Sequence, residues 1–349
     1  MWFETLMGFA EMSPSQVREK ISVSGDRMTS SANGRSYGCG TLGIPSLAEL
    51  RAELAKAPRK GTPTLRQVVG DARALHADPA NANATFQAAS QFNLLEMVSP
   101  DVHPEEGVGI YENDRTQGPA CAVSCGAGTI YRNYFVPVDG QIGQSKLHQI
   151  DCLKGVGDLL GNREPRSRRD EPGSPTAAAV RERSLWRMQN GYALLTEEGR
   201  THTSSHIRGL DEAGRDALRA ALRVGVHRDV EVTLPGAGHH VTQVYGAALA
   251  LGYGEGKPAD WEPLARVVLE ASYEATLIAA ALNAAKAGNE LVLLTLIGGG
   301  VFRNDPAWIL GAIERALKTP GLGALDVAIV AYRTADPQVT ALVDRLAKG

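Results

Sequence analysis

The chain has 349 residues, 43% of them hydrophobic, and carries 36 Lys and Arg against 39 Asp and Glu, a net charge of −3. This length is enough to bury a core in one large domain or two modest ones. The small negative charge excludes a basic surface that would hold nucleic acid nonspecifically. No apolar run approaches the roughly 20 residues of a membrane span, and the first residues, which include Glu4, lack a basic secretory leader. We therefore expect a cytoplasmic protein without a membrane partner.

The cysteines are Cys39, Cys121, Cys125 and Cys152, too few for a disulfide framework in so long a chain. We expect reduced thiols. Cys121 and Cys125, followed by His148 and Cys152, could supply four zinc ligands, but the first pair lies in a small-residue segment typical of a packed helix. We therefore expect no metal ion and no cofactor.

Taken singly, the histidines point to no metal site either. His148 and His206 stand alone in the sequence, where surface or core positions are the commoner use. His239 and His240 are adjacent at the start of a strand, so their side chains point to opposite faces.

Residues 1–60 are expected to form an N-terminal extension packed on the core. Within it a helix is predicted from Ser46 to about Ala57. Ser46 is a good N-cap, and Glu49 three residues later completes a capping box.

The domain proper is expected to span residues 61–349. Strands are predicted at 68–70 and 85–89, followed by a helix from Pro119 to about Tyr134. A long insertion is expected at about 136–228. Its most polar part, 161–183, mixes Pro, Gly, Ser and Arg, which favours a solvated loop over a partner-binding surface.

The last third of the chain gives the clearest pattern. Residues 230–234 and 241–249 are β-like runs, and apolar residues from Glu262 to about Lys286 recur at helical spacing. Residues 291–297 form a continuous apolar run, typical of a strand covered on both faces. Asp305 and the proline after it indicate a helix start.

A second apolar run at 325–332 predicts another buried strand. Strand, helix and strand joined by short connections make a parallel, right-handed βαβ unit. The fold class expected is α/β: a three-layer α/β/α sandwich around a mixed, mainly parallel sheet, with an N-terminal extension and an insertion.

Three consecutive glycines, Gly298, Gly299 and Gly300, follow the 291–297 strand. Glycines allow the backbone N–H groups to converge on phosphate oxygens beside the start of a helix. A tight turn without a ligand would need the same residues. The chain has neither the Gly-x-Gly-x-x-Gly of dehydrogenases nor a Gly-x-x-x-x-Gly-Lys-Ser/Thr phosphate loop, so another phosphate-binding α/β fold is required.

Four stretches, in order, resemble the macrodomains, a family that binds ADP-ribose and in several branches hydrolyses ADP-ribosyl linkages. Residues 70–75 (GDARAL) resemble its Gly-Asp-Ile-Thr stretch, and 86–90 (FQAAS) its Val-Asn-Ala-Ala-Asn strand. Residues 117–122 (QGPACA) are similar to the first glycine-rich loop. Residues 298–302 (GGGVF) are similar to the second loop, which wraps the diphosphate.

The resemblance implies that Asp71 contacts adenine and that Phe302 lies beside the distal ribose. It also implies that the 86–90 strand points polar groups at that ribose. The ligand-binding residues expected are Asp71, Ala72, Gln87, Ser90, Asn93, Asn113, Thr116, Gln117, Gly118, Gly298, Gly299, Gly300, Val301 and Phe302.

The sequence also departs from the family. Both asparagines of the strand motif are replaced, by Gln87 and Ser90. Ala120 stands where many hydrolytic members have an acidic residue, and the double glutamate of the poly(ADP-ribose) glycohydrolase branch is absent. Because of these departures, no catalytic residue is carried over from the family.

Two carboxylates close to the first loop are candidate catalytic groups. Asp114 and Glu112 lie on the segment that should border the distal ribose, where a carboxylate could activate a water. Asp114 is preferred because it is nearer the helix start, although it could equally cap that helix with Thr116. Asn93 could reach the ribose or satisfy backbone groups of a turn.

Three functions remain open. The first is a hydrolase that removes ADP-ribose from a protein or nucleic acid without a cofactor. The second is a module that binds ADP-ribose or an ADP-ribosylated macromolecule without turnover. The third is a protein-interaction scaffold, against which the glycines in both loops argue.

Overall fold

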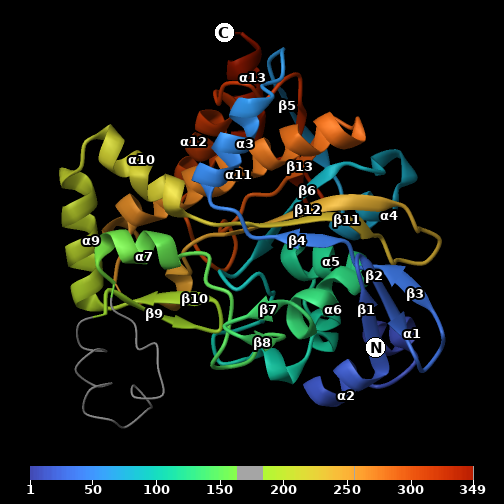
Figure 1. Cartoon of the computed structure of the whole chain (residues 1–349). Coiled ribbons are helices and arrows are strands. Elements are labelled where there is room, and N and C mark those ends of the chain that lie inside the picture. The colour runs from blue at the N-terminus through green and yellow to red at the C-terminus, as the bar shows by residue number, and fades with distance from the viewer. Residues whose placement is uncertain (163–183, 255, 349) are drawn as a thin grey trace, which may run out of the picture.

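The computed structural model describes residues 1–162, 184–254 and 256–348. Its centre is a seven-stranded sheet in the order β4-β11-β12-β6-β13-β14-β5 (Figure 1). In chain order, these strands are β4 (Thr41–Gly43), β5 (Thr64–Val69), β6 (Thr85–Ser90), β11 (Gly225–Glu231), β12 (His240–Ala247), β13 (Leu291–Leu294) and β14 (Asp326–Ala331).

The sheet is mixed but mainly parallel. Strands β12, β6, β13, β14 and β5 run in one direction, and β11 pairs antiparallel with both of its neighbours, β12 and β4. The five parallel strands therefore place their carboxyl ends at one edge. This confirms the α/β fold class and the sheet predicted from the apolar runs.

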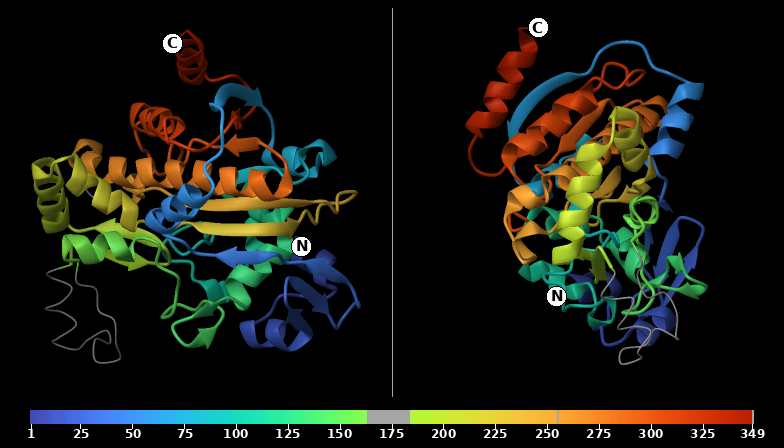
Figure 2. Two further views of the ribbon diagram at one scale, coloured as in Figure 1. Left: turned by 45° about the horizontal axis from the view of Figure 1, so that its top comes forward. Right: turned by 90° about the vertical axis from the view of Figure 1, so that its left-hand side faces the viewer.

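Helices cover both faces of the sheet, so the molecule has three layers (Figures 1 and 2). One face carries α3 (Leu47–Lys56), α11 (Glu262–Ala287) and α12 (Pro306–Leu317), with α13 (Pro337–Ala347) beside β5 and α12. The opposite face carries α4 (Ala72–Ala77), α5 (Gln117–Ser124) and α6 (Gly126–Tyr134).

The long helix α11 is the centre of the core. Its apolar residues contact β12, β6 and β13 on one side and α3 and α12 on the other. By length and composition alone, α11 could cross a membrane, but 89% of its most apolar window is buried inside the protein. Its apolar surface is therefore accounted for by packing.

The βαβ unit at the end of the chain is confirmed. β13 and β14 are parallel neighbours, and α12 connects them. The Asp305 side chain accepts a hydrogen bond from the backbone N–H of Ala307, and Pro306 occupies the first turn. At α3, the capping box of Ser46 and Glu49 is also present as predicted.

The helix predicted from Pro119 to Tyr134 is wrong in one respect: it is two helices, α5 and α6, with a break at Cys125. The Oγ1 of Thr233 accepts a hydrogen bond from the N–H of Gly126, and the N–H of Thr233 donates to Ser124 O. Thr233 follows β11 and bonds the backbone of the chain where α5 meets α6. The break is therefore caused by a tertiary contact.

The first 40 residues form a small layer against α6 and the loop before α5. It consists of α1 (Trp2–Met7), α2 (Pro14–Lys20), β1 (Ile21–Ser24), β2 (Arg27–Ser30) and β3 (Ser36–Gly38). The three strands make an antiparallel sheet of their own. The next strand, β4, joins the main sheet at its edge.

The segment after α6 adds further short elements. They are β7 (Pro137–Val138), β8 (Gln141–Ile142), α7 (Lys154–Leu160), β9 (Trp186–Gln189), β10 (Tyr192–Leu195), α9 (Glu197–Gly209) and α10 (Glu212–Ala221). Most of the predicted polar loop, 161–183, lies outside the described residues. Residues 225–228, placed at the end of the predicted insertion, belong to β11. The predicted N-terminal extension contributes β4 to the main sheet, and the predicted insertion contributes the first residues of β11.

Candidate functional site

The loops at the carboxyl edge of the parallel strands form the candidate site. Ligands of open α/β sheets bind at this edge. Here the edge collects the loop after β5 with Asp71, the loop after β6, the glycine loop after β13, and the loops after β12 and β14. The sheet topology thus gathers the segments that carry the predicted ligand residues.

The glycine loop after β13 has a fixed shape. Gly298 has φ 76°, and a Cβ atom there would lie 2.6 Å from atoms of Ala248 and Asn304, so only glycine fits. The Asn304 side chain donates hydrogen bonds to Leu249 O at 2.9 Å and to Gly298 O at 3.3 Å, and its backbone N–H also bonds Gly298 O. Asn304 therefore closes the loop.

The other end of this loop is held from the core. The Tyr273 hydroxyl donates to Thr295 O at 2.7 Å and accepts from the N–H of Ile297 at 3.0 Å. These bonds turn the chain directly after Leu294, which is why β13 ends earlier than its apolar run predicts.

The tip of the loop offers backbone donors to a ligand. Among the residues that the structure describes, no acceptor pairs with the N–H groups of Gly300 and Val301. Both residues are exposed, and a Cβ atom at Gly300 would meet open space. Adjacent free N–H groups on a glycine loop can bind an anion such as a phosphate.

The first loop is packed tightly against β6. The Gln117 side chain accepts from the N–H of Ala89 at 2.9 Å and donates to Gln87 O at 2.7 Å, so it bonds the strand backbone. A Cβ atom at Gly118 would lie 2.1 Å from Ala89 O, so only glycine allows this approach. In the structure, the contacts of Gln117 and Gly118 with β6 position the start of α5.

The two candidate catalytic carboxylates have different environments. Glu112 accepts a hydrogen bond from the backbone N–H of Trp2 at 2.8 Å, so it holds the N-terminal helix. Asp114 is half-buried, and its Oδ1 accepts from the N–H of Thr116 at 2.8 Å. Asp114 is therefore the better placed of the two to act on a ligand, although it also caps the turn into α5.

Three aromatic rings meet beside Asp114. Tyr192 of β10, Tyr253 and Phe302 have ring centroids 5.3–6.0 Å apart. Burial raises the pKa of Tyr192, and the neighbouring Tyr253 and the negative charge of Asp114 raise it further. Phe302 of the glycine loop, Asp114 of the first loop and a strand of the predicted insertion therefore lie together.

The loop after β5 places Asp71 beside another aromatic residue. Asp71 is exposed and caps α4, accepting from the N–H groups of Arg73 and Ala74. Because Val69 pairs with Ala331, the carboxyl end of β14 is adjacent, and Tyr332 there is 59% exposed. Asp71 and an accessible ring thus share one end of the edge.

Three predicted ligand residues of the β6 region are buried in the protein instead. Gln87 donates to Thr276 Oγ1 at 3.1 Å and accepts from the N–H of Thr295 at 3.2 Å. Ser90 donates to Gln91 O, and Asn93 donates to Gln149 Oε1 while accepting from the N–H of Leu95. The side chains of Gln87 and Ser90 thus bond groups within the core, and Asn93 accepts from a turn N–H, the alternative that the sequence left open.

The remaining predicted contacts lie at the edge. Asn113 and Thr116 are exposed beside Asp114, and Ala72 is half-buried in the first turn of α4. Gly299 is exposed in the glycine loop.

A buried charged pair lies beneath the first loop. Glu96 is 3% exposed, and its Oε1 is 3.5 Å from Nη2 of Arg132, too far for a good hydrogen bond. Burial raises the pKa of Glu96 to about 8, although Arg132 opposes the shift. The guanidinium also lies 3.7 Å from the centre of the Tyr245 ring. The Glu96 side chain packs against Gly118 at the start of α5.

The cysteines are all buried and unpaired. Burial raises the pKa of Cys121, which disfavours the thiolate needed for metal binding. Across residues 1–162, 184–254 and 256–348, no three His, Cys, Asp or Glu side chains form a group able to hold a metal ion.

Four residues of this edge escaped the sequence analysis: Tyr192, Tyr253, Asn304 and Tyr332. Their role depends on contacts between distant segments, such as the hydrogen bond of Asn304 to Leu249 O. For Tyr332 and Asn304 a local signal exists, since Tyr332 directly follows β14 and Asn304 closely follows the three glycines. Tyr111, in the loop before α5, is buried, and its hydroxyl accepts from the N–H of Glu96.

The fold and the site define an α/β protein with a glycine loop, whose tip carries free backbone N–H groups, at the carboxyl edge of a mainly parallel sheet. No family model and no curated protein matches the chain. Among solved structures it is similar to the poly(ADP-ribose) glycohydrolase of Deinococcus radiodurans in complex with ADP-ribose, with 16% identity and a TM-score of 0.42 over 88% of this chain and 94% of that one.

Two structures of the Thermomonospora curvata poly(ADP-ribose) glycohydrolase are similar as well. One has 13% identity and a TM-score of 0.42 over 95% of this chain and 97% of that chain. The other, bound to the inhibitor ADP-HPD, has 14% identity and a TM-score of 0.40 over 95% and 96%. Each likeness describes overall shape at low identity and assigns no role to a residue of this chain.

Proposed function

We propose that this chain is a divergent macrodomain-like protein that binds ADP-ribose, or an ADP-ribosyl group on a macromolecule, at the carboxyl edge of its sheet. The observation that carries the proposal is the pair of free N–H groups at Gly300 and Val301, on a loop that Gly298 and Asn304 hold in shape. Backbone donors on such a loop suit a diphosphate, even in a protein of net negative charge.

The rest of the ligand is accommodated by residues on either side of the loop. At one end, Asp71 would accept a hydrogen bond from the adenine amino group and Tyr332 would stack on the base. At the other end, Phe302 and Tyr253 would pack against the distal ribose. The order of these groups along the edge matches the order of base, diphosphate and ribose in ADP-ribose.

We further propose that the protein hydrolyses the ADP-ribosyl linkage. Asp114, beside the distal-ribose end, would orient and deprotonate a water that attacks the anomeric carbon. The bond from that carbon to the macromolecule would break, and the leaving atom would take up the proton that Asp114 has received. The glycine loop would hold the diphosphate fixed during this step. Phe302 and Tyr192 would exclude bulk water from one side of the reacting carbon.

Calorimetric titration with ADP-ribose, ADP and AMP tests the binding proposal. We expect saturable binding in which ADP-ribose binds more tightly than ADP and ADP more tightly than AMP. ADP lacks the distal ribose, and AMP lacks the second phosphate as well. Equal affinity for all three ligands would show that the diphosphate and distal ribose are not recognised. Absence of ADP-ribose binding at millimolar concentration would overturn the proposal.

A reader module that binds without turnover is the second candidate. It is favoured because Glu112, one of the two candidate catalytic carboxylates, accepts a hydrogen bond from the N–H of Trp2. Only Asp114 of that pair is then left to act on a water. Incubating the protein with ADP-ribosylated protein and measuring released ADP-ribose separates the two functions. Binding with no release over hours would establish the reader.

A further inference from the structure

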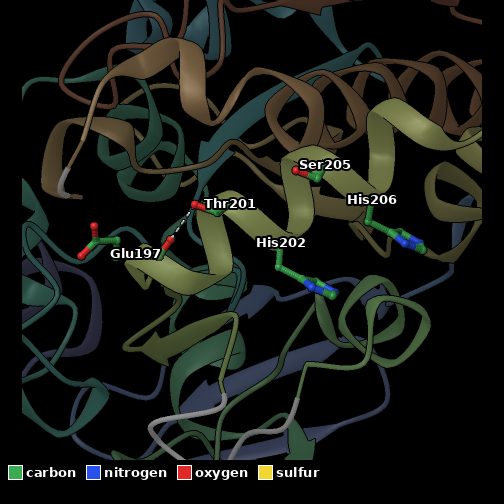
Figure 3. Close-up of a pocket in the computed structure, with 5 residues that line it drawn as sticks. All are labelled: Glu197, Thr201, His202, Ser205 and His206. Carbon is green, nitrogen blue, oxygen red and sulfur yellow. Dashed lines mark hydrogen bonds between the residues drawn. The ribbon is translucent and has the colours of Figure 1, made fainter.

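Helix α9, remote from the glycine loops in sequence, carries two histidines one helical turn apart. His202 and His206 are both exposed, and their rings are nearly parallel, with 4° between the planes and 6.2 Å between the centroids. Figure 3 shows both imidazoles pointing outward on the same side of the helix. Within the part of the chain that the structure describes, neither ring has a hydrogen-bond or ion-pair partner.

We propose that His202 and His206 together chelate a divalent transition-metal ion of the Zn²⁺, Ni²⁺ or Cu²⁺ class. Imidazole nitrogen is a preferred ligand of these ions. Residues four apart on a helix lie on one face, and two histidines at this spacing bind zinc on the helix of many metalloproteases. Hard cations such as Mg²⁺ and Ca²⁺ prefer oxygen ligands, so the site should discriminate against them.

The helix backbone is fixed while the two rings are free to adjust. The Thr203 hydroxyl donates to Gly199 O at 2.6 Å, the Ser204 hydroxyl donates to Asp260 O, and Ile207 is buried in the core. A metal with nitrogens at about 2.0–2.1 Å needs the two ring atoms roughly 3 Å apart. Exposed side chains change rotamer rapidly, so the rings can converge without moving α9.

The site has two protein ligands, and water would complete the coordination. Glu197, on the first turn of α9, points away from the imidazoles in Figure 3. The described residues contain no group of three metal-binding side chains, here or elsewhere. We therefore expect binding that is weaker than at a structural zinc site and that leaves coordination positions open to another donor.

The interaction does not depend on ADP-ribose binding. His206 follows His202 by four residues in the sequence, and the helical conformation of α9 places their two rings side by side. The metal would link two successive turns of α9 and stabilise that helix.

The test is calorimetric titration of NiCl₂ and ZnCl₂ into the tag-free full chain, with MgCl₂ as the negative probe. We expect one ion per chain for Ni²⁺ and Zn²⁺ and no binding of Mg²⁺. Because the two ligands act as a chelate, His202→Ala and His206→Ala should each weaken binding by about 100-fold. His148→Ala, which changes a histidine outside α9, should leave affinity unchanged.

A spacing control keeps two histidines on α9 but separates them by two turns. In the double variant His206→Ala with Gly209→His, the rings lie about 10 Å apart along the helix and cannot share one ion. A Cβ atom at Gly209 meets open space, so the variant should fold, which circular dichroism would verify. Retained affinity in this variant, an equal loss with His148→Ala, or no Ni²⁺ binding to the wild-type chain would overturn the proposal.

Discussion

Asp114 is the side chain on which the catalytic proposal depends. Its Oδ1 accepts a hydrogen bond from the N–H of Thr116, so replacing it by alanine would disturb the start of α5 as well as remove the charge. Asparagine keeps an acceptor for this N–H and loses only the carboxylate. The two substitutions therefore separate a chemical role from a structural one.

We predict that Asp114→Asn retains ADP-ribose affinity within a few-fold and lowers the release of ADP-ribose by roughly 100-fold or more, the usual contribution of a general base. Single-turnover release from ADP-ribosylated protein measures this effect. Glu112→Gln serves as the matched control, because Glu112 is bonded to Trp2 and should affect release little. Unchanged turnover in Asp114→Asn would remove Asp114 from the mechanism.

The raised pKa of the Glu96 carboxyl group makes the stability of the protein depend on pH. Burial raises its pKa in the folded protein to about 8, above the ordinary value of 4.5. The folded state therefore holds the proton more tightly, and the contribution of Glu96 to stability is complete below pH 4.5 and is lost as the pH rises to 8. Arg132 opposes this loss but does not abolish it.

Glu96→Gln should remove that pH dependence. Relative to the wild type, we expect the variant to gain more than about 1.4 kcal/mol in the free energy of unfolding between pH 5 and pH 8, the equivalent of one pKa unit. Urea unfolding at several pH values measures the difference. Glu197→Gln, at an exposed position of α9, should show no such trend. Parallel stability curves for Glu96→Gln and wild type would contradict the assignment.

Single residues also show where sequence reasoning stops. The 86–90 motif was correctly predicted to be a strand, but its side chains alternate between faces, and pairing with β12 and β13 decides which face meets α11. Gln87 faces Thr276 of α11, so it cannot reach a ligand. Gln117 bonds the backbone of β6, and Asn93 donates to Gln149, so both have partners that are distant in sequence.

At the scale of elements, the glycine loop after β13 joins fold and function. Gly298 has a positive φ that favours glycine, whereas Gly300 has space for a side chain and its φ is not positive. A large residue at Gly300 should therefore leave the fold intact and cover the N–H groups that the proposal assigns to the diphosphate.

We predict that Gly300→Trp lowers ADP-ribose affinity by at least about tenfold, or roughly 1.4 kcal/mol, with little change in thermal stability. Calorimetry and thermal unfolding measure the two properties. Gly209→Trp is the control, since its position is equally open but lies at the end of α9. Equal affinities for Gly300→Trp and wild type would place the ligand elsewhere.

Elements with strong periodic patterns were predictable, and those shaped by contacts were not. The βαβ unit of β13, α12 and β14 was confirmed because its apolar runs and its Asp-Pro start are local signals. The break between α5 and α6 depends on Thr233, more than 100 residues away, as its hydrogen bond to Gly126 shows. The aromatic contact of Tyr192 with Phe302 likewise joins β10 to the glycine loop.

At the scale of the whole molecule, the N-terminal layer holds the loop that leads to Asp114. The Glu11 carboxylate accepts from the N–H groups of Val108 and Gly109 at 3.0 and 2.6 Å and from the Tyr134 hydroxyl at 2.7 Å. The chain before residue 60 therefore fixes the first loop, a role that its composition does not reveal.

We predict that Glu11→Ala destabilises the protein by about 1–3 kcal/mol, because it leaves partly buried N–H donors without an acceptor. Amide hydrogen exchange should show lost protection at Val108 and Gly109, with β13 and β14 unchanged. Glu4→Ala, at an exposed position of α1, is the matched control. Unchanged protection at Val108 would mean that Glu11 does not hold the loop.

The most direct test of the central claim is to follow the backbone amides of Gly298–Phe302 by ¹⁵N NMR during titration with ADP-ribose. If the loop binds the diphosphate, the amides of Gly300 and Val301 should shift saturably to lower field, with a smaller response to AMP. Saturable binding that leaves both amides unperturbed would contradict the account, because the ligand would then lie away from the glycine loop.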